Sequence, residues 1–228
     1  MIDFKSIPKF CISLISSSDR RSWCLKMQKI MQLDNFNFVN AVDLKDCDFF
    51  EETLQKFIPT FGCLMSHYKV FKHAIDNRLT EIMVLEDDFC HDTKYRDDIY
   101  QYIADIPENY DLVLFGNLIE GSVEFINDIK KINGPFWGTH AYIINENLMI
   151  KYINFIENKI LRNDLIHSDA LLSYLCFYED LNVFHPKNNL IKQMPFSSLN
   201  NHEYLNFLII DKEIKQKILD HTNDHKLF

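Results

Sequence analysis

The stretch that decides the fold is EIMVLEDD, residues 81–88. Its opening run, EIMVL, is short and apolar, and such a run predicts a buried β-strand. Three consecutive carboxylates follow it directly. Because ligands of α/β proteins bind beyond the carboxyl ends of strands, this segment predicts a sheet strand that carries acidic side chains to a binding edge.

Outward from this stretch, short apolar runs alternate with segments of helical periodicity. We expect further strands at residues 10–15, 37–42, 111–115, 141–144 and 182–184. We expect helices at residues 19–31, 64–75, 95–103, 148–156 and 169–178, with a mixed helical pattern over 203–219. We also expect Asp19 to cap the first helix and Gly62 to mark the start of the second. The alternation is typical of an α/β fold with a mostly parallel central sheet and flanking helices.

Length and composition indicate a globular chain. The 228 residues are 47 % hydrophobic and 25 % charged, which argues against disorder. The net charge of −9 argues against a nucleic-acid partner that is bound through its phosphates. No linker is visible, so we expect a single domain over residues 1–228.

Targeting and redox signals point to one compartment. The apolar runs are far shorter than the ~20 residues of a membrane-spanning helix, and the N-terminus lacks the apolar region of a secretory signal. The six cysteines form no CxxC pair, so we expect buried, reduced thiols rather than a zinc finger or a disulfide framework. We therefore expect a cytoplasmic protein without a transmembrane segment.

The three carboxylates after the strand, Glu86, Asp87 and Asp88, allow two readings. Side chains alternate along a strand, so we expect Glu86 and Asp88 on one face and Asp87 on the other. Hard cations such as Mg²⁺ and Mn²⁺ prefer oxygen ligands and often bridge to phosphates. The segment is then either a metal site at Glu86 and Asp88 that neutralises a diphosphate, or a solvated acidic turn that caps the next helix.

The segment SSSDRR, residues 16–21, lies between the first strand and the first helix. Backbone amides at a helix N-terminus favour anions, and Arg20 and Arg21 could pair bidentately with a phosphate. By itself, however, the segment favours a capped helix with exposed basic residues in its first turn.

Three more segments carry polar groups at element boundaries: GCLMSH at residues 62–67, GTHAY at residues 138–142 and HSD at residues 167–169. Taken alone, each segment is better explained as a structural feature than as part of a functional site. Asp169 is either a partner of the helix dipole or a general base. The sequence contains no serine-hydrolase elbow, Walker loop or GxGxxG fingerprint.

Taken in order, these segments resemble glycosyltransferase family 25, which includes lipooligosaccharide galactosyltransferases and collagen hydroxylysine galactosyltransferases. The matching pieces are ISL at 12–14 with DRR at 19–21, GCLMSH at 62–67, VLEDD at 84–88, GTHAY at 138–142, and SD at 168–169, with a weaker match at 186–193 and Ser197. The resemblance covers residues 11–198 and leaves residues 199–228 as a C-terminal extension.

The resemblance implies a nucleotide-sugar-binding fold of the type called GT-A. It implies an inverting transfer of a hexose, galactose or glucose, from a UDP-sugar to a hydroxyl of a glycan or of a peptidyl hydroxylysine. It also implies a divalent cation, Mn²⁺ or Mg²⁺. Glu86 and Asp88 would take the metal and ribose roles of the DxD-like element, and Gln193, with His185 and His202 nearby, would supply the third metal ligand.

The resemblance assigns the remaining roles by motif. Asp169 is the first candidate for the base that takes the acceptor proton, with His67 and His140 behind it. The residues expected to contact the donor are Leu14, Ser16, Arg20, Arg21, Gly62, Ser66, His67, Glu86, Asp87, Thr139 and His140.

Three rival functions remain open at this point. The chain could hold a nucleotide sugar without transferring it, could be a metal-dependent phosphohydrolase that uses the acidic cluster, or could be a structural domain that binds a partner through its many phenylalanines. A homo-oligomer is left open as well.

Overall fold

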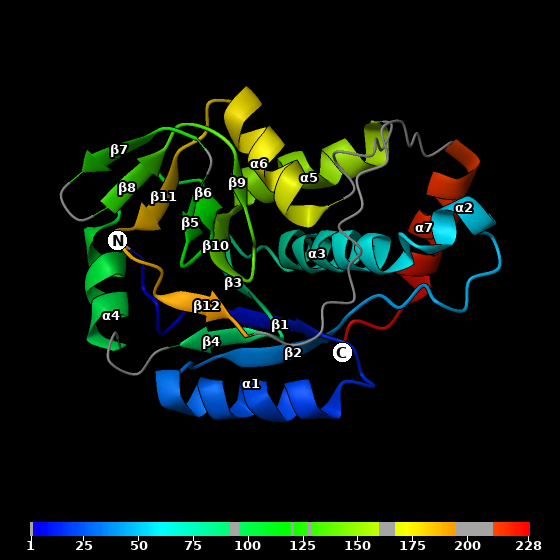
Figure 1. Cartoon of the computed structure of the whole chain (residues 1–228), viewed down its shortest axis with the longest axis horizontal. Helices are drawn as coiled ribbons and strands as arrows, with labels where there is room; N and C mark the ends of the chain where they lie inside the picture. The colour runs from blue at the N-terminus through cyan, green and yellow to red at the C-terminus, as the bar shows by residue number, and fades with distance from the viewer. Residues whose placement is uncertain (1, 92–95, 120, 127–128, 160–166, 195–211) are drawn as a thin grey trace.

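A central eight-stranded sheet organises the structure (Figure 1), a computed structural model that describes residues 2–91, 96–119, 121–126, 129–159, 167–194 and 212–228. The strands follow in the order β2-β1-β3-β10-β5-β11-β8-β7. Their bounds are β1 Lys9–Ser13, β2 Phe36–Asn40, β3 Glu81–Glu86, β5 Leu112–Leu114, β7 Val123–Ile126, β8 Ile129–Ile132, β10 Ala141–Asn145 and β11 Val183–Pro186.

Two small sheets and seven helices complete the described part of the chain. The small sheets pair β4 Phe89–His91 with β12 Ile191–Gln193, and β6 Leu118–Ile119 with β9 Phe136–Trp137. The helices are α1 Ser18–Met31, α2 Glu52–Gln55, α3 Ile58–Asp76, α4 Arg96–Asp105, α5 Glu146–Asn158, α6 Ser168–Tyr178 and α7 Lys212–Asp224.

The strand directions in the main sheet are mixed, so the prediction of a mostly parallel sheet was wrong. Strands β1–β2, β1–β3 and β5–β11 pair in parallel. Strand β10 runs antiparallel to both β3 and β5, and β8 runs antiparallel to β11 and β7. An apolar run has the same pattern in either direction, which is why the sequence did not reveal the reversal of β10.

Helices cover both faces of the sheet, which explains the continuous apolar runs of its central strands. On β3, Ile82 and Val84 join the core formed with α3, α5, α6 and α7, while Met83 and Leu85 join the core formed with α1 and α4. Figure 1 shows α1 and α3 on opposite sides of β1 and β2. The expected α/β architecture with flanking helices is therefore confirmed.

Two expectations about helix starts were wrong. Helix α1 begins at Ser18 with Ser17 as its N-cap residue, so Asp19 lies inside the first turn. Helix α3 begins at Ile58, and Gly62 lies within it. A Cβ atom on Gly62 would lie 2.6 Å from the carbonyl oxygen of Val42. The glycine therefore marks a close approach of helix and backbone rather than a helix start.

The C-terminal extension is part of the packed molecule where the structure describes it. Helix α7 buries Ile214, Ile218 and Leu219 against the α3 side of the sheet. Ser197 and His202, together with the first part of the predicted 203–219 segment, lie outside the described residues.

The cysteines are unpaired thiols. Cys11, Cys24 and Cys176 are buried, as expected, whereas the side chains at positions 47, 63 and 90 are partly exposed. Among the described residues, no helix is both long enough and apolar enough to span a membrane.

Candidate functional site

The carboxyl ends of several strands meet at one edge of the sheet. Because β10 is antiparallel to its neighbours, the turn before it lies at the same edge as the end of β3. The Glu86 amide donates a hydrogen bond to the His140 carbonyl oxygen at 3.0 Å, which fixes this juxtaposition. Strand β1 reaches the edge through Ile12, which is in register with Glu86. The acidic residues and the GTHAY segment are thus neighbours because β10 runs antiparallel to β3.

Arg20 on α1 joins the two aspartates that follow β3. Its Nη1 lies 2.6 Å from Asp87 Oδ1, and its Nη2 lies 3.4 Å from Asp88 Oδ2. Strand β3 ends at Glu86, so strict alternation of side chains does not extend to the two turn residues, and Arg20 contacts both of their carboxylates. Both aspartates are 6 % exposed and β4 follows them, so the reading as a solvated cap of a helix was wrong.

Asp87 is satisfied by the protein itself. Its Oδ2 accepts a hydrogen bond from Ser13 Oγ at 2.8 Å, and its Oδ1 pairs with Arg20. Burial raises the pKa of Asp87, although Ser13 and Arg20 act in the opposite direction. Its role in the structure is to anchor α1 and the end of β1 to the turn after β3.

Asp88 keeps one carboxylate oxygen free. Its Oδ2 accepts a hydrogen bond from Gln193 Nε2 at 2.8 Å, whereas its buried Oδ1 has no hydrogen-bond partner. Burial and the neighbouring Glu86 raise the pKa of Asp88 to about 6. Buried polar atoms are nearly always satisfied in folded proteins, so this oxygen marks a position for a cation or a donor.

Gln193 reaches Asp88 because β12 pairs with β4, which places Gln193 opposite Phe89. The Met194 amide also donates to the Asp88 carbonyl oxygen at 2.7 Å. The proposed third metal ligand and Asp88 are therefore adjacent, although 105 residues separate them in the chain.

Glu86 faces a different set of partners from the aspartates. Thr139 Oγ1 donates to Glu86 Oε1 at 3.1 Å, and His67 Nε2 lies 3.5 Å from the same oxygen. Burial pushes the pKa of Glu86 upward, but His67, His140 and Thr139 outweigh it, and the net effect is a lowered pKa. The Glu86 side chain is 25 % exposed, so it remains accessible from solvent.

Asp169 stands in the first turn of α6, and backbone amides hold it on two sides. Its Oδ2 accepts from the Gly138 amide at 2.9 Å, and its Oδ1 accepts from the Ala170 amide at 2.8 Å. Gly138 has φ +83°, a left-handed conformation that glycine adopts without strain.

Cys63 on α3 lies beside one of the acids, because its Sγ is within 4.8 Å of a Glu86 carboxylate oxygen. Burial raises the pKa of its thiol, and the negative charges of Glu86, Asp169, Asp88 and Asp87 raise it further. These charges come from β3, the following turn and α6. Cys63 lies inside the GCLMSH segment, but no role for it was expected from the sequence.

The predicted donor-binding residues after β1 have different contacts in the structure. The Arg21 guanidinium donates to the carbonyl oxygens of Ser13 and Leu14 and stacks over the Phe38 ring at 5.0 Å. Ser16 is exposed on the loop between β1 and α1. Of the two arginines, Arg20 is therefore the one that contacts the acidic cluster.

Other predicted donor contacts lie deeper in the fold. Ser66 Oγ donates to the Gly62 carbonyl oxygen at 2.6 Å and accepts from the Val42 amide at 2.8 Å. His140 Nε2 lies 3.1 Å from the Ile191 carbonyl oxygen. The contact of Gly62, Ser66 and His140 with a donor stays a prediction.

Asn117 is a further polar group at the same edge, and no role for it was expected from the sequence. It follows β5, is 7 % exposed, and neither polar atom of its side-chain amide has a hydrogen-bond partner. The preceding Gly116 has no room for a side chain, because its Cβ would lie 1.9 Å from the Ile191 carbonyl oxygen. Asn117 could have been identified from the sequence by its position just beyond the end of a strand.

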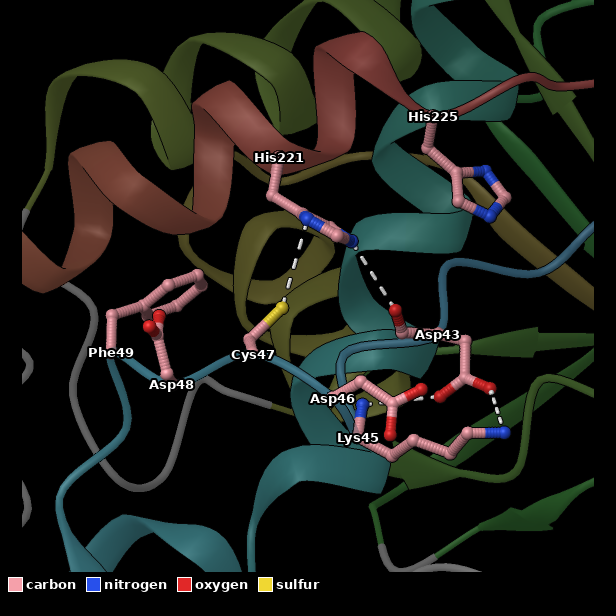
Figure 2. A pocket seen from close by; sticks show the side chains of 8 residues that line it. All are labelled: Asp43, Lys45, Asp46, Cys47, Asp48, Phe49, His221 and His225. Carbon is pink, nitrogen blue, oxygen red and sulfur yellow. Dashed lines mark hydrogen bonds and ion pairs between the residues drawn. The ribbon is translucent and has the colours of Figure 1, made fainter.

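A cavity of about 420 Å³ lies elsewhere, between α7 and the loop after β2 (Figure 2). It contains none of the predicted site residues. Its lining residues are Asp43, Lys45, Asp46, Cys47, Asp48, Phe49, His221 and His225.

The fold matches one that glycosyltransferases use. A glycosyltransferase involved in the glycosylation of the major capsid of PBCV-1 superposes with a TM-score of 0.50 at 10 % identity, over 94 % of this chain and 98 % of that one. At this identity the likeness concerns the fold alone.

The sequence gives the family. Residues 6–171 match glycosyltransferase family 25 (LPS biosynthesis protein), so the chain belongs to glycosyltransferase family 25. Glycosyltransferase 25 family members of Drosophila pseudoobscura pseudoobscura and Anopheles gambiae are each 26 % identical, over 161 and 158 residues, or 60 % and 59 % of this chain. The chain spans about a quarter of the length of these relatives.

Proposed function

We propose that the chain transfers galactose or glucose from a UDP-sugar to a hydroxyl of a glycan or a peptidyl hydroxylysine, with inversion and with the help of Mn²⁺ or Mg²⁺. The observation that carries the proposal is the buried, unpartnered Oδ1 of Asp88 at the carboxyl edge of the sheet, beside Glu86. Family membership supports the transfer of a sugar.

Three of the residues at this edge could act as oxygen ligands of a hard cation, and Asp87 could not. Asp88, Glu86 and Gln193 offer carboxylate and amide oxygens, which Mg²⁺ and Mn²⁺ prefer. Asp87 does not belong to this set, because Ser13 and Arg20 already occupy its oxygens. When bound, the cation supplies positive charge that stabilises the leaving diphosphate.

Arg20 keeps the two aspartates together and offsets their mutual repulsion. With Arg20 across Asp87 and Asp88, the unpartnered Oδ1 is the atom of Asp88 left for a ligand. The guanidinium also adds positive charge close to where a diphosphate would lie, which favours binding of that anion.

Asp169 is the residue that we assign to the acceptor proton. Two backbone amides orient its carboxylate, and each oxygen retains a lone pair for a hydroxyl donor. Of the competing histidines, His140 Nε2 lies 3.1 Å from the Ile191 carbonyl oxygen, whereas His67 lies between Tyr142 and Glu86, with Nδ1 2.6 Å from Tyr142 Oη and Nε2 3.5 Å from Glu86 Oε1. A base within hydrogen-bond reach of the acceptor hydroxyl is what direct inversion requires.

The first test is release of UDP from UDP-galactose and UDP-glucose, with Mn²⁺ and after treatment with EDTA. We expect Asp88→Ala to lower turnover by roughly 100-fold or more, because a bound cation contributes several kcal/mol to charge stabilisation. The exposed Asp105→Ala is the matched control and should retain turnover.

Two outcomes would contradict the proposal. Metal-independent turnover by Asp88→Ala would remove the cation from the mechanism. Tight binding of the UDP-sugar without turnover on any acceptor would instead favour the nucleotide-sugar-binding module.

A further inference from the structure

Three side chains of different chemistry meet beside the acidic turn. Cys63 Sγ, a ring nitrogen of His67 and a carboxylate oxygen of Glu86 all lie within 4.8 Å of one another. Cys63 and His67 are four residues apart on α3 and so share one face of that helix. Glu86 approaches them from the end of β3.

The His67 ring is prepared for a ligand on one side. The residue is fully buried, and its Nε2 has no hydrogen-bond partner and lies 3.5 Å from Glu86 Oε1. Its other nitrogen, Nδ1, lies 2.6 Å from Tyr142 Oη. A metal-bound histidine commonly donates from its second nitrogen to such a partner, which fixes the tautomer and the ring orientation. With Nδ1–H donated to Tyr142 Oη, Nε2 would carry the lone pair that a metal ion takes.

We propose that Cys63, His67 and Glu86 bind a zinc ion. One thiolate, one imidazole and one carboxylate form a three-residue donor set of the kind that leaves a fourth tetrahedral position open to water or substrate. The sulfur ligand favours zinc over Mg²⁺ and Mn²⁺, which take oxygen ligands. This zinc set differs chemically from the proposed manganese set of Glu86, Asp88 and Gln193. The two sets share only Glu86.

Sharing Glu86 has a consequence for activity. Zinc at the three-residue set occupies the carboxylate that the manganese set also needs, so zinc competes with manganese. That competition rests on the proposed function, whereas zinc binding itself does not.

The direct test uses Co²⁺ as a spectroscopic substitute for zinc on the full chain, reduced and freed of metal. We expect one equivalent of Co²⁺ to give a thiolate-to-cobalt charge-transfer band that Zn²⁺ abolishes by displacement. Cys63→Ser should remove the band, and His67→Gln should weaken Co²⁺ binding by about tenfold or more.

The matched control is Cys47→Ser. Cys47 Sγ lies 3.6 Å from His221 Nδ1 in the cavity of Figure 2, so it is a second thiol beside an imidazole. The band should persist in this variant. Loss of the band in Cys47→Ser, or its persistence in Cys63→Ser, would overturn the proposed site.

Two further measurements keep the result independent of folding and of the proposed function. In the unmodified chain, zinc should slow alkylation of Cys63 by iodoacetamide, read by peptide mass spectrometry, and should not slow that of Cys90; equal rates for Cys63 with and without zinc would refute the site. Asp88→Asn should retain the cobalt band while losing manganese-dependent turnover, which separates the two metal sets.

Discussion

At the scale of single residues, two adjacent aspartates have different environments. Asp87 has both oxygens occupied by Ser13 and Arg20, whereas Asp88 retains an oxygen that is buried and unpartnered. The difference arises because the chain turns after Glu86 and directs the two carboxylates to different neighbours. The proposed cation site therefore uses Glu86 and Asp88, whereas both oxygens of Asp87 are occupied by the protein itself.

Asp169 allows a prediction at this scale. We expect Asp169→Asn to lower turnover by roughly 100-fold or more, because the amide has almost no basicity, while the affinity for the UDP-sugar changes little. The asparagine can still accept from one of the two backbone amides, so a loss of about 1 kcal/mol in stability is expected.

The measurement is kcat for transfer together with donor binding by calorimetry. Asp105→Ala serves again as the exposed control. If donor affinity collapses while kcat at saturation stays unchanged, Asp169 is a binding residue and not the base.

At the scale of elements, α3 is the helix that assembles the site. One part of its surface carries Cys63 and His67 toward Glu86. Another part carries Gly62 and Ser66 against the backbone of Val42, beyond the end of β2. The helix is thereby held between two strand ends, and its register decides where Cys63 and His67 lie.

Gly62→Ala tests that contact. In an unobstructed helix, replacing glycine by alanine stabilises by about 1 kcal/mol. Here the new Cβ would lie 2.6 Å from the Val42 carbonyl oxygen, so we expect destabilisation by about 1–3 kcal/mol. Urea denaturation measures the difference, with the exposed Lys26→Ala on α1 as the control. A stabilised Gly62→Ala protein would show that α3 does not approach Val42 this closely.

At the scale of the whole molecule, residues 212–228 close the α3 side of the fold. Lys69 Nζ donates to the Thr222 carbonyl oxygen, and the Asn40 amide donates to the Leu227 carbonyl oxygen at 2.8 Å. Phe228 contacts the rings of Phe10 and His73. This part of the C-terminal extension therefore contributes to the core, although it lies outside the segment that matches the family.

Ile218 measures that contribution, because its side chain is 1 % exposed within the main core. We expect Ile218→Ala to lower the free energy of unfolding by about 2–4 kcal/mol, the usual cost of a cavity at such a site. The comparison is with Gln216→Ala, an exposed position on the same helix. Equal urea midpoints for the two variants would show that α7 is peripheral.

The sequence by itself determined several of the main strands and helices and the position of the acidic residues at the end of a strand. The apolar runs at residues 10–15, 81–85 and 141–144 contain strands, and the acids after Leu85 lie at the end of one of them. These features follow from local periodicity and from the general rule that ligands bind at the carboxyl ends of strands.

Only the tertiary structure decided how the side chains pair. The reversal of β10, the attachment of Arg20 to both aspartates, and the meeting of Cys63 and His67 with Glu86 join segments far apart in the chain. Local periodicity sets which face of an element a residue occupies, but the partner across that face depends on long-range packing. For that reason the location of the acidic site was predictable, whereas the three-residue zinc set became visible only in the folded chain.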